Sequence, residues 1–321
     1  MEGDTLTEEM ATREAYGKAL VELGRKNPSI VVLDADLSKS TKTVLFADEF
    51  PLRFFNMGVA EADMIGTAAG LAASGFIPFV STFGVFATGR VYDQIRNSVA
   101  YTKMNVKIAA THTGITVGED GASHQSFEDI ALMRVLPNMT VVVPADARQT
   151  CQAVEAAAKH EGPLYLRLGR PKVPPVISPE VPFELGKAQL LREGDDLVFI
   201  ATGITVGIAL EAASLMERHN ISAAVVNVHT IKPLDEVLLL QLAQKTGAIV
   251  TIEEHSIIGG LGGAIAELVS ENCPVPVIRV GINDSFGESG SPKELLQKYG
   301  LTVNKLISAG KAAVEKKVRA Y

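Results

Sequence analysis

One polar stretch of the sequence combines the residue types that proton transfer needs. Residues 112–125 (HTGITVGEDGASHQ) contain two of the six histidines, His112 and His124, with two acids and three glycines. Imidazole and carboxylate groups on a glycine-shaped loop suit proton transfer and the binding of hydroxyl groups. The alternative is a solvated loop that caps the next helix, but a long polar loop inside a compact domain favours function. A metal site is the weaker alternative, because the histidines lack close ligand spacing and no HExxH or CxxC motif occurs.

A carboxylate stands at the start of a largely apolar helix. Residues 56–75 (NMGVAEADMIGTAAGLAASG) predict a turn at Gly58 and a helix that begins at Glu61 and ends at Gly75. The helix is small or apolar on every face, which predicts burial. Burial favours a neutral acid at Glu61, whereas the positive end of the helix dipole favours a carboxylate. A helix-capping role and a functional role both remain open for this residue.

Aromatic and basic residues supply two further candidates. Phe83 and Phe86 stand at a strand-to-helix turn and could form a stacking platform for a flat heterocycle, although a core position is the alternative. Guanidinium groups bind phosphate in a bidentate manner. The arginines considered for a substrate phosphate, each with a surface position as the alternative, are Arg13, Arg167 and Arg170.

The elements around these residues alternate between strands and helices, which predicts an α/β fold with a mostly parallel sheet covered on both faces. Strands are predicted at 29–35, 76–83, 106–111, 140–143 and 164–168, with helices at 12–24, 61–74, 90–102 and 145–159. Ligands bind at the carboxyl ends of such strands. We therefore expect the residues that follow strand ends to converge at one edge, namely Asp36, Phe83, His112 and Arg170.

A proline-rich segment divides the chain. Five of the fifteen prolines fall between Arg170 and Leu185, which predicts an extended linker at 171–185 between domains at 1–170 and 186–321. The second domain repeats the alternating pattern, with strands at 197–201, 223–228, 248–253 and 277–280 and helices at 206–219, 234–245, 260–270, 292–298 and from 303. Its glycine run at 259–263 could hold a phosphate at a helix start, although a lone run is weak evidence. The preceding Glu253, Glu254 and His255 are predicted to be turn and interface residues.

Composition excludes several classes of protein. The 321 residues are 47% hydrophobic and carry a net charge of −7, without a Lys/Arg tract, which argues against a nucleic-acid partner. No apolar run reaches membrane-spanning length, and the acidic segment Met1–Met10 does not read as a signal peptide. Cys151 and Cys273 have no CxxC partner, so we expect reduced thiols in a cytoplasmic protein.

Three motifs together make the chain resemble a known family over essentially its whole length. GVAE at 58–61 is similar to a segment whose glutamate contacts N1′ of the thiamin aminopyrimidine. GEDGASHQ at 118–125 is similar to a GEDGxTHQ loop, and Ser81–Phe83 with Phe86 is similar to an aromatic pocket for the pyrimidine ring. The chain thus resembles the C-terminal two-thirds of a transketolase, that is, a pyrimidine-binding domain followed by a C-terminal domain.

The resemblance implies transfer of a two-carbon ketol unit between sugar phosphates with thiamin diphosphate, and it implies a role for each matching residue. Glu61 would exchange a proton with N1′, while Phe83 and Phe86 would hold the pyrimidine ring. His112, Asp120 and His124 would bind sugar hydroxyls and assist proton transfers. The residues expected to hold the substrate phosphate are Arg13, Ser40 and Arg170.

One absence predicts a partner. The family binds Mg²⁺-diphosphate through a GDG motif in an N-terminal domain, and no GDG occurs here. Together with the early position of the first motif helix, this predicts one subunit of a split transketolase, with Mg²⁺ held mainly by a separate N-terminal-type subunit. We expect an α2β2 heterotetramer, with homodimerisation of the pyrimidine-binding domain through a small-residue helix face of Ala68, Ala69, Gly70, Ala72 and Ala73.

Departures from the family pattern leave alternatives open. Thr113 and Gly89 replace an aspartate and an aromatic residue that transketolases often carry, and RVYDQ at 90–94 is closer to deoxyxylulose-phosphate synthase. A subunit of such a synthase is therefore one alternative. A non-catalytic regulatory homologue is another, although retention of Glu61, Asp120 and His124 together argues against it.

Overall fold

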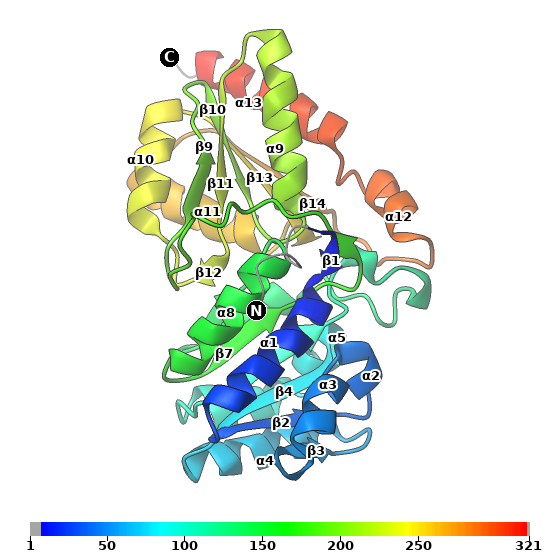
Figure 1. The fold of residues 1–321 in the computed structure, drawn as a ribbon. Helices are drawn as coiled ribbons and strands as arrows, with labels where there is room; N and C mark the ends of the chain where they lie inside the picture. Colours follow the sequence, from blue (N-terminus) through cyan, green and yellow to red (C-terminus); the bar gives the residue numbers. More distant parts are fainter. Residues whose placement is uncertain (1–7, 320–321) are drawn as a thin grey trace.

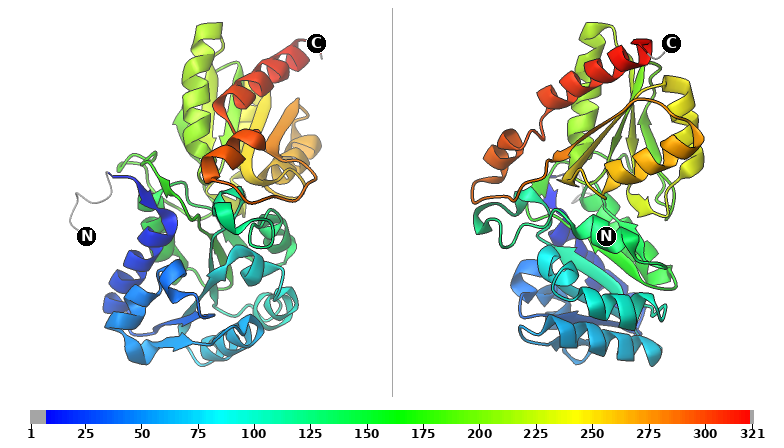
Figure 2. Two further views of the ribbon diagram at one scale, coloured as in Figure 1. Left: turned by 90° about the vertical axis from the view of Figure 1, so that its right-hand side faces the viewer. Right: turned by 180° about the vertical axis from the view of Figure 1, so that it is seen from behind.

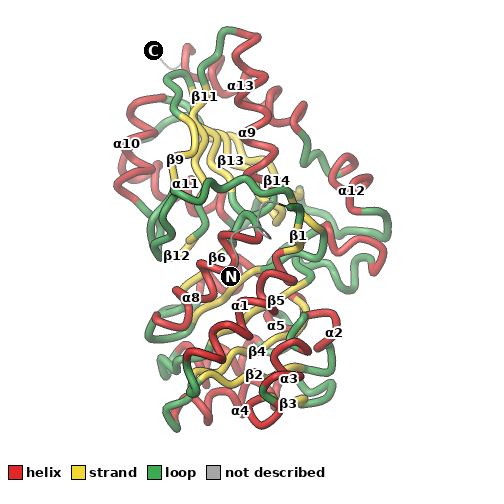
Figure 3. Tube along the Cα trace, in the orientation of Figure 1, coloured by secondary structure: helices red, strands yellow, loops and turns green. Residues whose placement is uncertain are grey.

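The computed structural model describes residues 8–319, which form two α/β lobes stacked end to end (Figure 1 and Figure 2). Residues 1–7, most of the acidic start of the chain, and residues 320–321 of the predicted second domain lie outside the described residues. The predicted fold class is confirmed, because each lobe has a mostly parallel sheet flanked by helices (Figure 3). None of the helices described is long and apolar enough to span a membrane.

The first lobe is built on a seven-stranded sheet in the order β12-β6-β7-β5-β4-β2-β3, parallel except for β12. Side chains of β2 and β5 are buried on both faces, as in the central strands of a covered parallel sheet, and most of them are apolar. The strands are β2 (Ile30–Asp34), β3 (Phe54–Asn56), β4 (Ile77–Phe83), β5 (Lys107–Thr111), β6 (Thr140–Val142), β7 (Leu164–Arg167) and β12 (Thr230–Lys232).

Helices cover both faces of this sheet. Along β2, Ile30 and Val32 pack into the cluster that contains α1 and α8, whereas Val31 and Leu33 pack into the cluster that contains α4 and α7. The helices are α1 (Thr12–Lys26), α2 (Ser38–Thr41), α3 (Val44–Glu49), α4 (Glu61–Ala73), α5 (Gly84–Thr88), α6 (Tyr92–Gln94), α7 (Asp129–Val135) and α8 (Ala147–Lys159), with a π-helical segment at Ile95–Ala100 and 3-10 turns at Pro51–Arg53 and Ile115–Asp120.

The second lobe has a five-stranded sheet in the order β14-β13-β10-β11-β9, in which β9 is the antiparallel edge. Helices α9 and α13 pack on one face, and α10 and α11 pack on the other. The strands are β9 (Gln189–Arg192), β10 (Leu197–Ala201), β11 (Ala223–Asn227), β13 (Ile249–Ser256) and β14 (Val277–Ile282). The helices are α9 (Thr205–Met216), α10 (Glu236–Thr246), α11 (Leu261–Asn272), α12 (Pro292–Lys298) and α13 (Val303–Arg319), with a 3-10 turn at Glu217–His219.

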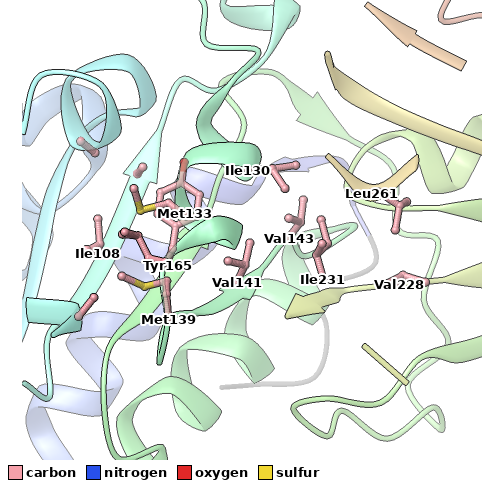
Figure 4. Close-up of a cluster of buried hydrophobic side chains, with 14 of the residues drawn as sticks. Ile108, Ile130, Met133, Met139, Val141, Val143, Tyr165, Val228, Ile231 and Leu261 are labelled. Carbon is pink, nitrogen blue, oxygen red and sulfur yellow. The ribbon is translucent and has the colours of Figure 1, made fainter. Parts of the chain in front are cut away.

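One apolar cluster spans the two lobes, and one strand from the second half of the chain joins the sheet of the first lobe. Figure 4 shows side chains of the first lobe, such as Val141 and Val143, continuing into Val228, Ile231 and Leu261 of the second. Strand β12 follows β11 in sequence, yet it pairs antiparallel with β6 at the edge of the first sheet. The sequence analysis did not predict this crossing strand.

The proline-rich segment lies against the first lobe. Its start forms β8 (Lys172–Val173), which pairs antiparallel with β1 (Met10–Ala11). Further along, the Asp146 carboxylate accepts hydrogen bonds from the backbone N–H groups of Val176 and Ile177, at 2.9 and 2.8 Å. The start of the segment is therefore extended, and the segment is attached to the first lobe at both points.

Helix α4 corrects one expectation. Burial on every face was predicted, yet Gly66 and Gly70 are exposed, and a methyl group added to either would meet nothing within 4 Å. Ala68, assigned to the face for a second subunit, instead packs fully buried in this chain's own core. Small residues suit burial, but in this lobe only one side of the helix meets the sheet. Homodimerisation through the exposed side stays a prediction.

Candidate active site

The carboxylate singled out from the sequence is buried at a helix start. Glu61 is the first residue of α4, and only 4% of its side chain is exposed. Its Oε1 accepts a hydrogen bond of 2.7 Å from Nη1 of Arg90, a residue that the sequence analysis did not select. The side chain therefore lies at the positive end of the helix dipole and has a cationic hydrogen-bond donor as its partner.

Two phenylalanine rings lie beside this ion pair. Phe83 ends β4 and Phe86 lies in α5, and their ring centroids are 6.0 Å apart with an interplanar angle of 12°. The guanidinium carbon of Arg90 lies 4.1 Å from the centroid of the Phe86 ring. Phe86 is partly buried and stacks with the Arg90 guanidinium, whereas Phe83 is 7% exposed and stacks on His112.

His112 directly follows β5 and has a left-handed backbone, with φ 53°, which is uncommon outside glycine and occurs preferentially at functional sites. Arg13 Nη1 lies 3.3 Å from its Nε2. Because arginine can only donate, Nε2 accepts, and Nδ1 carries the proton toward Thr111 Oγ1 at 2.9 Å. Burial, reinforced by the charges of Arg13 and Arg170, lowers the pKa of His112 to about 3, so the ring is neutral at neutral pH.

The remaining candidates lie around this histidine. Nη1 of Arg13 donates to the backbone oxygen of Ser40 at 2.9 Å. These two predicted phosphate-binding residues are therefore neighbours, although the contact uses the main chain of Ser40 and not its side chain. The edge of the His124 ring faces Phe86, with centroids 5.4 Å apart. Arg170 Nη1 donates to the backbone oxygen of Val117 and lies 3.8 Å from the partly exposed Asp120 carboxylate.

The structure thus brings most predicted residues into one cluster at the carboxyl ends of β4 and β5. Glu61 joins it through Arg90 and Phe86. Asp36 is different, since its carboxylate accepts from the Asn56 side chain. Arg167 is also different: it is 5% exposed and pairs with Asp129, so it is not available to a substrate phosphate.

The second lobe holds the loop at 112–125 in place. Glu254 Oε1 accepts from the backbone N–H of Thr116 at 2.6 Å, and Gln125 Nε2 donates to the backbone oxygen of Glu288 at 2.9 Å. Gly114 has φ 75°, and a β-carbon there would lie 2.3 Å from the Glu254 side chain. Glycine is therefore needed to let this carboxylate approach the loop. Glu254 thus contacts the other lobe, as predicted for an interface residue, but the predicted turn is wrong, because Glu253, Glu254 and His255 all lie in strand β13.

A buried ion pair between Arg167 and Asp129 supports the contact between Glu254 and the loop at 112–125. Arg167 Nε donates to Asp129 Oδ2 at 2.7 Å, and its Nη2 donates to the backbone oxygen of Glu254 at 2.9 Å. Burial alone would raise the pKa of Asp129, but Arg167, together with His255 and the Tyr165 hydroxyl, holds the pKa below its ordinary value. The pair therefore joins the end of β7 to the second lobe through fully desolvated charges.

The glycine run of the second lobe does not provide an anion site. The first backbone N–H groups of α11, those of Leu261 and Gly262, donate to the Glu253 carboxylate at 2.7 Å each. Glu253 thus fills the position that a phosphate would take at the helix start. In the described part of the chain, no group of three or more His, Cys, Asp or Glu side chains could hold a metal ion.

Comparison with known protein families identifies both domains of the chain. Residues 8–175 match the model of the transketolase pyrimidine-binding domain, and residues 186–306 match that of the transketolase C-terminal domain. The chain belongs to the transketolase family. The resemblance inferred from the three sequence motifs is confirmed.

Individual relatives agree with this assignment. The chain is 52% identical to a putative transketolase C-terminal section from Methanocaldococcus jannaschii, over 90% of this chain and 92% of the relative. It is 47% identical to a 6-deoxy-6-sulfo-D-fructose transketolase subunit from Clostridium sp. (strain MSTE9), over 97% and 96%. A solved structure described as a split-gene transketolase, inactive β4 tetramer, superposes with a TM-score of 0.90 at 59% identity, covering 96% of this chain and 99% of that one.

Membership of the transketolase family implies dependence on thiamin diphosphate. The residues present fit one half of this cofactor. Glu61 offers a buried carboxylate beside the Phe86 face, which suits a planar ring with a hydrogen-bonding nitrogen. A Mg²⁺-diphosphate needs several oxygen ligands, and the described residues contain no such group.

Proposed function

We propose that this chain is the C-terminal subunit of a two-subunit transketolase, which transfers a two-carbon ketol unit from a ketose phosphate to an aldose phosphate. The observation that carries the proposal is the buried Glu61 carboxylate beside Phe86, in one cluster with His112 and His124. Thiamin diphosphate, when bound, supplies the carbon nucleophile. Glu61 holds and returns the proton of the aminopyrimidine N1′, and the aromatic residues Phe83 and Phe86 orient the ring.

The polar residues of the cluster would bind the sugar. His112 is neutral, and its Nε2 can accept a hydrogen bond from a substrate hydroxyl. That hydroxyl would compete with Arg13 Nη1 for the same nitrogen. Asp120 and His124, on the loop that the second lobe holds, would accept and donate protons at the transferred carbons. Arg13 and Arg170, with Ser40, would bind the terminal phosphate. The sulfonate in the name of the Clostridium relative's substrate is a similar tetrahedral anion.

Assembly is part of the proposal. A separate N-terminal-type subunit would hold Mg²⁺ and the diphosphate, and the exposed side of α4 would meet a second copy of this chain in an α2β2 tetramer. The relatives described as a C-terminal section and as a split-gene β4 tetramer support this proposal. The free thiols of Cys151 and Cys273 support a cytoplasmic location.

We expect the purified chain alone to show no transketolase activity, because most of the cofactor's charge would be anchored by the other subunit. A coupled assay with xylulose 5-phosphate and ribose 5-phosphate, run on each subunit and on the mixture with Mg²⁺ and thiamin diphosphate, should detect activity only in the mixture. Full activity of the isolated chain would contradict the two-subunit proposal. Light scattering on the same samples should find the isolated chain oligomeric, and a monomer at micromolar concentration would contradict the α4 interface.

Asp120→Ala or His124→Ala should lower kcat/KM of the assembled enzyme by about 10- to 100-fold, the effect of losing one charge-assisted hydrogen bond to substrate. Cofactor affinity should be nearly unchanged, because the Glu61 and Phe86 contacts remain. The matched control is Asp284→Ala, an exposed carboxylate on the neighbouring loop of the second lobe. Normal kinetics in both variants would return the loop at 112–125 to a helix-capping role.

A further inference from the structure

The side chain of Arg90 makes two contacts that define its position. Its Nη1 donates to Glu61 Oε1 at 2.7 Å, and its guanidinium carbon lies 4.1 Å from the centroid of the Phe86 ring. The guanidinium is thus a planar, cationic hydrogen-bond donor held between a buried carboxylate and an aromatic face. Arg90 itself lies in the turn that joins α5 to α6, and its side chain is 47% exposed while that of Glu61 is only 4% exposed.

The aminopyrimidine ring of the cofactor needs the same two contacts. It is also flat, it bonds to a carboxylate through a ring nitrogen, and it packs on an aromatic face. One side of the Phe86 ring at this distance accommodates one planar group, so the guanidinium and the aminopyrimidine cannot both lie between Phe86 and Glu61. Resting on the proposed function, we propose that Arg90 competes with the aminopyrimidine ring for these two residues, and that the guanidinium moves off them when the cofactor enters.

Arg90 and Glu61 differ in how freely their side chains can move. A buried carboxylate without a partner is costly, and Arg90 is the hydrogen-bonding partner of Glu61 whenever the ring is elsewhere. Because Arg90 is half exposed and lies in a turn, its side chain can reach solvent without disturbing the sheet or α4. The pair thus holds the Glu61 carboxylate in a fixed orientation, at the cost of weaker cofactor binding.

Calorimetric titration of thiamin diphosphate into the assembled enzyme, at fixed excess Mg²⁺, tests this directly. Arg90→Ala should bind the cofactor about three- to tenfold more tightly than wild type, the combined effect of removing a partly exposed ion pair and a cation–π contact. Arg90→Lys should give an intermediate affinity, since an ammonium keeps the charge but not the planar fork. Arg96→Ala is the matched control, because Arg96 is exposed and donates to Asn97.

Several outcomes separate this proposal from the function on which it rests. Unchanged or weaker binding by Arg90→Ala, with wild-type binding intact, would overturn the competition and leave the proposed function standing. No cofactor binding by the wild-type assembly would overturn both. If Arg90→Ala fails to fold, Arg90→Lys and a crystal structure of the wild-type assembly with thiamin diphosphate and Mg²⁺ decide the matter. The guanidinium should have left Phe86 there, and retention of both contacts would overturn the proposal.

Discussion

Glu61→Gln should lower the turnover of the assembled enzyme by about 10²- to 10⁴-fold, the usual contribution of a positioned acid–base group. Glutamine keeps the size of the side chain and can still contact a planar donor, but it cannot accept and return a proton. Assembly should be unaffected, because the change adds no volume at the start of α4. The measurement is the coupled sugar-phosphate assay, with light scattering to confirm that the subunits associate.

The matched control is Asp93→Asn, which neutralises an exposed carboxylate on the helix that follows Arg90 and interacts with Asn97. We expect it to retain full activity. An active Glu61→Gln enzyme would remove the proton-transfer role and leave Glu61 as a helix cap with an arginine partner.

The second large effect is on stability. Arg167→Met should lower the free energy of unfolding by about 3–5 kcal/mol, because Asp129 would remain fully buried without its cation. Denaturant unfolding followed by circular dichroism measures this change. Arg25→Met is the control, since its partners Glu22 and Glu49 form surface ion pairs, and it should change stability little. A similarly small effect at Arg167 would show that water reaches the buried pair.

The pH dependence of this effect has a defined sign. In the wild type, the pKa of Asp129 is below its ordinary value, so the carboxylate contributes stability above pH about 4, and this contribution is lost as the pH falls further. In the variant, burial without Arg167 disfavours the carboxylate, and protonation relieves that penalty. The difference in stability between the two proteins should therefore shrink as the pH falls toward 4.

The sequence predicted the elements with the strongest patterns. The mainly apolar segments 29–35 and 106–111 became β2 and β5, because most side chains of a strand covered on both faces are apolar. The convergence of Phe83 and His112 also followed, since carboxyl ends of adjacent parallel strands meet at one edge. Short elements such as β12 were not predicted, because three residues carry no detectable period.

Contacts between distant charges were beyond the sequence analysis for a different reason. The sequence does not show whether an arginine side chain faces water or a buried acid. Arg90 was therefore not selected as a site residue, and Arg167 was considered for binding a phosphate. The folded chain brings Arg90 to Glu61 across 29 residues and Arg167 to Asp129 across 38. No periodicity encodes such pairs. Glu254, which holds the loop at 112–125 from the second lobe, was predicted only as an interface residue.

Strand β12 bears on how genes of this kind can be divided. It comes from the second half of the chain, yet it satisfies the backbone of β6 at the edge of the first sheet. A fragment ending within the proline-rich segment would leave the N–H and C=O groups of β6 open to pairing with other chains, which promotes aggregation. Fission or fusion at that segment is therefore disfavoured, although its composition resembles a linker. The smallest portable unit of this architecture includes both lobes.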